Sequence, residues 1–185
     1  MAYPLTIKIW AYPFCKILLR QIKGIENIPN KAPFIIAANH ESNYDHLLAL
    51  YPISKKLNKK VHFIAVPNWK HYLGKAYLKW AGIISLKSKK QAYDDAKCGI
   101  ESGEIVGIFP EGRLERKNRR ENPKTGAVRL AIETNTPILP IGIKFSYKPF
   151  SSTINIGKLK YMKKGKDIKK QTLDLMDYVY SLRIE

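Results

Sequence analysis

Short apolar runs alternate with helix-like runs along this chain of 185 residues, and this order limits its fold more than any other feature. The apolar runs are rich in isoleucine and valine, and we expect strands at residues 33–38, 61–66, 83–87, 104–109, 138–145 and 153–159. The remaining runs predict helices at residues 42–51, 68–80, 89–102, 125–134 and 167–183. Strands that alternate with helices form βαβ units, in which both faces of a parallel sheet are covered. The sequence therefore predicts one α/β domain with a mixed, largely parallel sheet flanked by helices.

The first polar motif follows the run at residues 33–38, where a strand is expected to give way to a loop. It contains His40 and Asp45, five residues apart. Five residues turn an α-helix by about 140°, so the two side chains can meet only if His40 lies in the loop and Asp45 in the first helical turn. Asp45 would then orient the imidazole and leave its other nitrogen free to act as a base. The alternative is that Asp45 only caps the helix start while His40 contacts a loop carbonyl.

The second polar motif, Phe-Pro-Glu-Gly-Arg at residues 109–113, closes the apolar run at 104–109. Proline and glycine continue a strand poorly, so we expect a turn there. A partly buried Glu111 needs partners, such as the hydroxyls of a polyol substrate or a nearby arginine. Arg113 could bind a phosphate through its guanidinium. The alternative is a turn in which Glu111 and Arg113 pair with neighbouring residues.

Together and in this order, the motifs resemble those of the glycerolipid acyltransferase family, the lysophosphatidic acid acyltransferases. The family's first block, Asn-His-x-x-x-x-Asp, is matched by Asn39, His40 and Asp45. Its third block, Phe-Pro-Glu-Gly, is matched by residues 109–112, and its fourth, an apolar run with paired prolines, by residues 137–141. The resemblance extends over residues 25–160.

The resemblance implies an acyltransferase in which His40, oriented by Asp45, takes a proton from the acceptor's hydroxyl, which attacks an acyl thioester. It implies substrate contacts from Asn39, Glu111, Gly112, Arg113, Lys87, Lys89 and Lys124. The implied acceptor is lysophosphatidic acid, with glycerol 3-phosphate or another lysolipid as alternatives. The implied donor is acyl-CoA or acyl carrier protein, with no bound cofactor and no metal.

Two blocks depart from the family pattern. The third block lacks its Thr-Arg ending, so Arg113 directly follows Gly112. The family's second block is a glycine followed six positions later by an arginine that binds phosphate. Gly82 is present, but Ser88 stands at the arginine's position, between Lys87 and Lys89. Phosphate binding is therefore expected from Arg113 and these lysines.

A strong positive charge indicates anionic partners. Thirty-three Lys and Arg residues against fifteen Asp and Glu residues give a formal net charge of +18, which suits an anionic membrane surface, phosphorylated substrates or nucleic acid. No RNP, helix-turn-helix, KH-like or zinc pattern is present, so we expect no nucleic acid. A basic lipid-binding or nucleic-acid-binding protein without catalysis is the alternative. Cys15 and Cys98 lack metal-ligand spacing, so we expect a reduced protein with two apolar thiols on the cytoplasmic side.

The N-terminal residues 1–22 are aromatic, aliphatic and basic in alternation. No run approaches the roughly 20 apolar residues that span a bilayer. Pro4 and Pro13 are expected to break any long helix. Aromatic side chains among lysines suit a peripheral segment in the headgroup layer, followed by the acyltransferase domain at residues 23–185. The alternative is a pair of short helices packed on the protein's own core.

Overall fold

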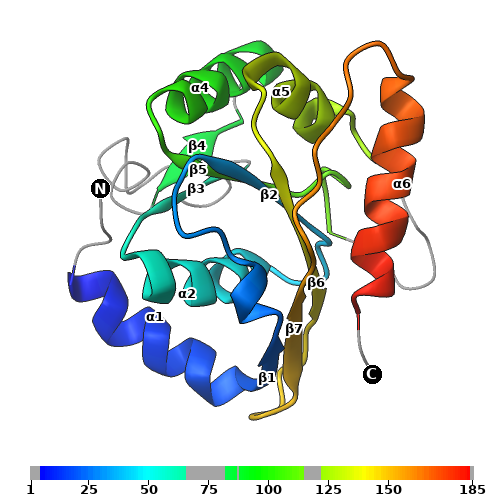
Figure 1. Ribbon diagram of the computed structural model, residues 1–185. Helices are drawn as coiled ribbons and strands as arrows, with labels where there is room; N and C mark the ends of the chain where they lie inside the picture. Colours follow the sequence, from blue (N-terminus) through cyan, green and yellow to red (C-terminus); the bar gives the residue numbers. More distant parts are fainter. Residues whose placement is uncertain (1–4, 66–81, 87, 115–121, 184–185) are drawn as a thin grey trace.

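The computed structural model describes residues 5–65, 82–86, 88–114 and 122–183 (Figure 1). The helices are α1 (Leu5–Leu18), η1 (Ile25–Asn27, a 3-10 helix), α2 (Asp45–Leu57), α4 (Lys89–Glu101), α5 (Gly126–Thr134) and α6 (Ile168–Ser181). The strands are β1 (Leu19–Lys23), β2 (Phe34–Ala38), β3 (Val61–Ala65), β4 (Ile83–Ser85), β5 (Ile105–Ile108), β6 (Ile138–Lys144) and β7 (Ser152–Ile156). Each strand expected from the sequence overlaps one of these strands. The helix expected at residues 68–80 lies outside the described residues.

The described strands form one seven-stranded sheet in the order β1-β7-β6-β2-β5-β3-β4. The five strands from β6 to β4 run parallel, β7 is antiparallel to β6, and β1 is parallel to β7. This confirms the mixed, largely parallel sheet expected from the sequence. β2 and β5 are parallel neighbours, with Phe34 opposite Ile105. The loops that follow these two strands therefore leave the sheet side by side at one edge.

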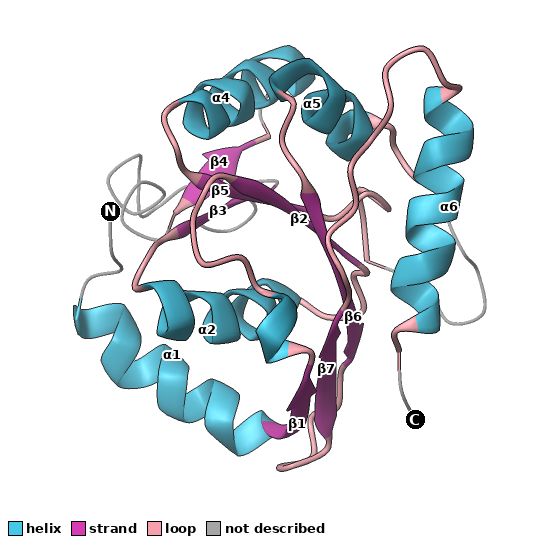
Figure 2. Ribbon diagram, viewed as in Figure 1, coloured by secondary structure: helices cyan, strands magenta, loops and turns pink. Residues whose placement is uncertain are grey.

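Helices cover both faces of the sheet: α1 and α2 lie on one face, and α4, α5 and α6 on the other (Figure 2). β2 contributes side chains to the hydrophobic cores on both faces of the sheet. Its Phe34, Ile36 and Ala38 belong to the core on the α1 and α2 face, while Ile35 and Ala37 belong to the opposite core. Side chains alternate along a strand, so a strand covered on both faces is apolar at every position.

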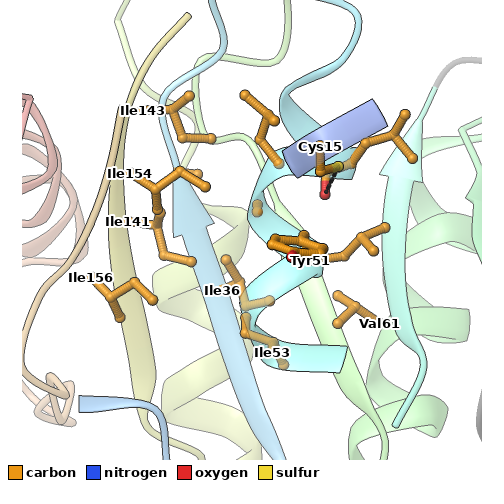
Figure 3. Packing of buried hydrophobic residues seen from close by; sticks show 14 of the residues in the cluster. Cys15, Ile36, Tyr51, Ile53, Val61, Ile141, Ile143, Ile154 and Ile156 are labelled. Atoms are coloured by element: carbon orange, nitrogen blue, oxygen red, sulfur yellow. Dashed lines mark hydrogen bonds between the residues drawn. The ribbon is translucent and has the colours of Figure 1, made fainter. Parts of the chain in front are cut away.

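The core beneath α1 and α2 consists mainly of branched aliphatic side chains. Ile36 of β2 and Ile141 of β6 lie across from Tyr51 of α2 and Cys15 of α1 (Figure 3). Burial raises the pKa of the Cys15 thiol to about 12, so this thiol stays neutral and packs as a small apolar group, as expected. Cys98 is exposed, and the prediction of an apolar, packed thiol is wrong at that position.

The N-terminal helix differs from the sequence prediction. α1 continues through Pro13 to Leu18, so the expectation that this proline breaks the helix is wrong, and one helix replaces the pair considered as an alternative. Proline removes one hydrogen bond inside a helix. Tertiary packing compensates for that loss, because Ala11, Cys15 and Leu18 are buried against the core.

The strand after α1 was not predicted. β1 pairs with β7, with Leu19 opposite Ser152 and Ile22 opposite Ile154. The boundary suggested between residues 22 and 23 falls inside this strand. No helix in the described part of the chain is long and apolar enough to cross a bilayer.

Candidate active site

The first motif forms a histidine–carboxylate pair at the carboxyl end of β2. His40 lies in the loop after the strand, and Asp45 is the first residue of α2. Nδ1 of His40 lies 3.1 Å from Oδ2 of Asp45. The two side chains therefore meet in the loop-to-helix geometry that their spacing required. An ionised carboxylate can only accept, so Nδ1 carries the proton and Nε2 keeps a free lone pair.

Asp45 also fixes the loop that carries His40. Its Oδ2 accepts hydrogen bonds from the backbone N–H groups of Glu41 and Ser42, both at 2.6 Å. Its Oδ1 is buried and accepts no hydrogen bond from the described residues. The carboxylate sits in the first turn of α2, where the helix dipole favours negative charge. One oxygen thus holds both the imidazole and the backbone around it.

Aromatic rings stack against one face of the His40 imidazole. The imidazole stacks on Phe109, with ring centroids 4.2 Å apart and planes 12° apart. Phe109 stacks in turn on Phe63 at 5.3 Å. The His40 side chain keeps 19% of its surface exposed, whereas the Asp45 side chain has none. The His40 side chain is accessible to a ligand, and the Asp45 carboxylate beside it is not.

Asn39 is a buried residue whose side-chain amide pairs with β6. Its Nδ2 donates to the carbonyl of Ile143 at 2.8 Å, and its Oδ1 accepts from the N–H of Ile143 at 2.7 Å. The residue is fully buried. Both ends of the amide are thus engaged within the protein, and the expected substrate contact of Asn39 stays a prediction. Asn39 joins the end of β2 to β6 and so supports the His40 loop.

Glu111 also supports the loop. Its side chain is 2% exposed, its Oε2 accepts from the backbone N–H of His40 at 3.0 Å, and its Oε1 accepts from the hydroxyl of Tyr180 at 2.8 Å. The need for partners was correctly inferred, since both carboxylate oxygens accept hydrogen bonds from the protein. The expected contact of Glu111 with an acceptor's hydroxyls stays a prediction. The structure thus joins the two motifs through Glu111 and His40.

The turn after Glu111 places two basic residues at the same edge of the sheet. Gly112 has a φ of 71°, a left-handed conformation that suits glycine. The N–H of Lys124 donates to the carbonyl of Pro110 at 2.6 Å, and a Cβ at Gly112 would lie 3.5 Å from Lys124 Cγ. Arg113 and Lys124 are both exposed. Both residues thus lie at the surface beside the turn.

Of the two lysines that flank Ser88, Lys89 lies further along this edge of the sheet. Lys89 is exposed and begins α4, after β4, which is two strands beyond β5 and so about 10 Å away. Ser88 caps α4, because its hydroxyl accepts from the N–H of Gln91 at 3.4 Å. The residue at the arginine position of the family pattern is therefore a helix cap. Lys87 lies outside the described residues.

Three charged or polar residues near the site were not predicted from the sequence: Glu41, Tyr180 and Arg183. Tyr180 contacts Glu111, and Arg183 forms an ion pair with Glu41. Glu41 occupies a variable position of the first block, and the other two residues come from the end of α6. The sequence shows α6 as an amphipathic helix, but no local pattern indicates which loop its last turn reaches.

Among the residues that the structure describes, no group of three or more His, Cys, Asp or Glu side chains could hold a metal ion. His62 of β3 lies 3.4 Å from Glu104, Nε2 to Oε2. Burial lowers the pKa of His62, and the Glu104 carboxylate opposes that shift. His62 therefore belongs to the packing of the sheet.

Comparison with known proteins gives consistent matches. A family model described as Acyltransferase matches residues 20–144. A 1-acyl-sn-glycerol-3-phosphate acyltransferase of Borreliella burgdorferi is 30% identical over 122 residues, which is 65% of this chain and 49% of that protein. A chloroplastic 1-acyl-sn-glycerol-3-phosphate acyltransferase of Brassica napus is 31% identical over 147 residues, 72% of this chain and 40% of that protein. The chain thus spans half or less of the length of these curated relatives.

The fold has a counterpart among solved structures. The crystal structure of the 1-acyl-sn-glycerophosphate acyltransferase PlsC from Thermotoga maritima superposes with a TM-score of 0.73. The match covers 96% of this chain and 77% of that chain, at 19% sequence identity. At this level of identity the likeness concerns the fold.

Proposed function

The chain belongs to the acyltransferase family, and on that premise we propose that it transfers an acyl group from a thioester to the free hydroxyl of lysophosphatidic acid, giving phosphatidic acid. The observation that carries the proposal is the His40–Asp45 pair, 3.1 Å apart at the carboxyl end of β2. This pair lies inside the matched region. The names of the curated relatives support the choice of acceptor.

We propose His40 as the general base and Asp45 as the group that orients it. Nε2 of His40 takes the proton of the acceptor's hydroxyl as its oxygen attacks the thioester carbonyl carbon. The carbon–sulfur bond then breaks, and the leaving thiolate receives the proton from Nε2. Asp45 stabilises the imidazolium that exists between these two transfers. Because the thioester is already activated, the reaction requires no nucleophile from the protein.

We propose that the acceptor's phosphate lies against the exposed basic residues at this edge of the sheet. Arg113 and Lys124 stand beside the turn at Gly112, and Lys89 begins α4. Lys87 is included on its sequence position alone. Guanidinium and ammonium groups bind phosphate through charge-assisted hydrogen bonds. The donor is proposed to be acyl-CoA or acyl carrier protein, and the reaction needs no bound cofactor and no metal because it transfers no electrons and starts from an activated ester.

We propose that α1 attaches the protein to the cytoplasmic side of an anionic membrane. Leu5, Ile9, Pro13 and Ile17 are spaced four apart and all exposed, so they form one outward apolar face. Such a face beside lysines suits the boundary between headgroups and acyl chains. Lys16 is exposed on the same helix. The opposite side of α1 packs on the core, so attachment would leave the fold intact.

The direct test is acyl transfer by the purified protein with labelled acyl-CoA or acyl carrier protein. The acceptors are lysophosphatidic acid, glycerol 3-phosphate and an uncharged lysolipid, and the comparison variant is His40→Ala. We expect transfer to lysophosphatidic acid, and a loss of about 10²- to 10⁴-fold in His40→Ala with an unchanged circular dichroism spectrum. A lack of transfer to every acceptor from both donors would contradict the proposal. Salt-sensitive binding of lipid or nucleic acid that ignores His40 would then indicate a binding protein.

A further inference from the structure

We infer that the C-terminal end of α6 is a positioning element for His40, acting through Tyr180 and Arg183. Each of these side chains holds a carboxylate on one of the two motif loops, and each carboxylate in turn holds backbone at the site. The inference deepens the proposed function and rests on it for the identity of the base. It concerns residues beyond the segment matched by the family model, which ends at residue 144.

The first connection runs from Tyr180 to the backbone of His40. The Tyr180 hydroxyl donates to Oε1 of Glu111 at 2.8 Å, and Oε2 of the same carboxylate accepts from the His40 N–H at 3.0 Å. Glu111 is almost completely buried, so its carboxylate depends on hydrogen-bond donors supplied by the protein. Removing the hydroxyl takes away one of those donors. The carboxylate is then less firmly placed, and so is the amide that it holds.

The second connection runs from Arg183 to Glu41, the residue that follows His40. Arg183 Nη2 forms an ion pair with Oε1 of Glu41, and Oε2 of Glu41 accepts from the N–H of Phe145 at 3.0 Å. The backbone N–H of Glu41 donates to Asp45 at 2.6 Å. The guanidinium carbon also lies 5.9 Å from the centre of the Tyr180 ring. Tyr180, near the end of α6, and Arg183, two residues beyond it, therefore both contact carboxylates that hold the backbone around His40.

Two glycines allow the end of α6 to come this close. A Cβ at Gly142 of β6 would lie 2.6 Å from the backbone carbon of Leu182, and a Cβ at Gly157 would lie 2.7 Å from Leu182 Cδ1. At Gly142 the clash would be with backbone, so a larger residue would push the chain after α6 outward, whereas at Gly157 the side chain of Leu182 would have to move. Gly142 directly precedes Ile143, whose backbone Asn39 holds. The sheet thus provides a close seat for α6 next to the residues that support His40.

The test compares Tyr180→Phe with Tyr178→Phe in the full chain. Tyr178 is a matched control on the same helix, since its hydroxyl lies 3.4 Å from the N–H of Lys158 and not at Glu111. We expect kcat of Tyr180→Phe to fall about tenfold, the loss expected when a hydrogen bond to a charged group is removed. The KM for lysophosphatidic acid should stay unchanged, because the role inferred for Tyr180 acts through Glu111 and not through the substrate. Tyr178→Phe should retain the kcat of the wild type.

A spectroscopic measurement tests the same connection without activity. The backbone amide of His40, followed in a ¹H–¹⁵N NMR spectrum, should shift in Tyr180→Phe and stay in place in Tyr178→Phe. An unmoved His40 amide together with an unchanged kcat would overturn the inference. If the wild type transfers no acyl group, the proposed function fails, and the amide shift alone decides whether Tyr180 positions His40.

Arg183 supplies an independent pair of variants. Arg183→Gln removes the charge that faces Glu41, and Arg183→Lys keeps it. We expect a lower kcat in Arg183→Gln and a partial return in Arg183→Lys, again with an unchanged KM. Equal kcat in the two variants and the wild type would overturn the role assigned to Arg183, whichever result Tyr180→Phe gives.

Discussion

At the scale of single residues, the site depends on carboxylates that hold backbone. Asp45, Glu111 and Glu41 each accept at least one main-chain N–H around His40 or directly after β6. Each such bond removes a degree of freedom from the loop, so the imidazole is placed before a substrate arrives. Substitutions of these carboxylates should therefore change the position of the His40 imidazole as well as the charge around it.

Asp45→Asn tests the electrostatic part of this arrangement. An amide oxygen at residue 45 can still accept from Glu41 and Ser42, but a neutral side chain does not stabilise the imidazolium of His40. We expect kcat to fall by about 10²-fold or more while the melting temperature stays close to that of the wild type. The exposed Asp94→Asn on α4 is the control and should keep full activity. Equal turnover in Asp45→Asn and the control would contradict the pairing.

His62 should make the protein less stable in acid. Burial holds the pKa of His62 below its ordinary value, Glu104 opposes this, and Lys60 reinforces it. The unfolded chain therefore binds more protons at this residue below about pH 6.5, so the free energy of unfolding falls as the pH drops. In His62→Gln we expect a smaller decrease in melting temperature between pH 7 and acid than in the wild type. Melting curves that depend on pH identically would show that His62 does not contribute.

At the scale of elements, the contact between β3 and β5 supports the His40 ring. Gly107 lies opposite Phe63, and a Cβ there would fall 2.3 Å from that ring. Gly107→Ala should displace Phe63 and with it the ring stack that ends at His40. We expect a loss of about 1–3 kcal/mol in the free energy of unfolding, measured by chemical denaturation. Gly126→Ala, where a Cβ meets nothing within 4 Å, should cost much less; equal losses would contradict the packing argument.

The outward face of α1 makes a second prediction at this scale. Replacing Ile9 and Ile17 by Glu removes apolar surface and adds charge that anionic lipid repels. We expect co-sedimentation with anionic vesicles to fall about tenfold or more, with the melting temperature unchanged because both side chains are more than half exposed. Leu173→Glu is the control, since Leu173 is half exposed on α6, across the sheet. Equal binding by both variants would show that α1 is not the attachment surface.

At the scale of the whole molecule, charge should govern the first encounter with lipid. A net charge of +18 attracts an anionic surface over a distance set by the ionic strength, whereas apolar contacts do not depend on it in this way. We expect high salt to weaken binding to anionic vesicles strongly and to change binding to zwitterionic vesicles little. The measurement is co-sedimentation across a salt series. Binding that does not respond to salt would mean that the apolar face of α1 alone accounts for the affinity for lipid.

Strands could be predicted from the sequence wherever helices cover both of their faces. β2 and β6 are apolar along nearly their whole length because helices cover both of their faces. β1 could not be found in this way, because Leu19–Lys23 is an edge strand with mostly exposed positions and reads as a polar segment. The spacing of His40 and Asp45 predicted their contact because it depends on one loop and one helical turn.

The rest of the site could not be predicted, because its partners come from distant parts of the chain. Glu111 was expected to need donors, but Tyr180 lies 69 positions away. Asn39 reaches Ile143 across 104 positions. Such contacts exist only once β6 lies beside β2 and α6 rests on the sheet. A local pattern shows that a carboxylate needs a partner, and only the fold shows which partner it has.

The pairing of β1 with β7 also sets an order of assembly during synthesis. The ribosome delivers Leu19 long before Ser152, its partner across the two strands. Until β7 emerges, β1 lacks the strand with which it pairs, so the core that α1 and α2 share stays incomplete on that side and partly open to water or lipid. Closing so long a loop is slow. We therefore expect the nascent chain to be most prone to aggregation, and most attracted to membrane, just before the seventh strand is made.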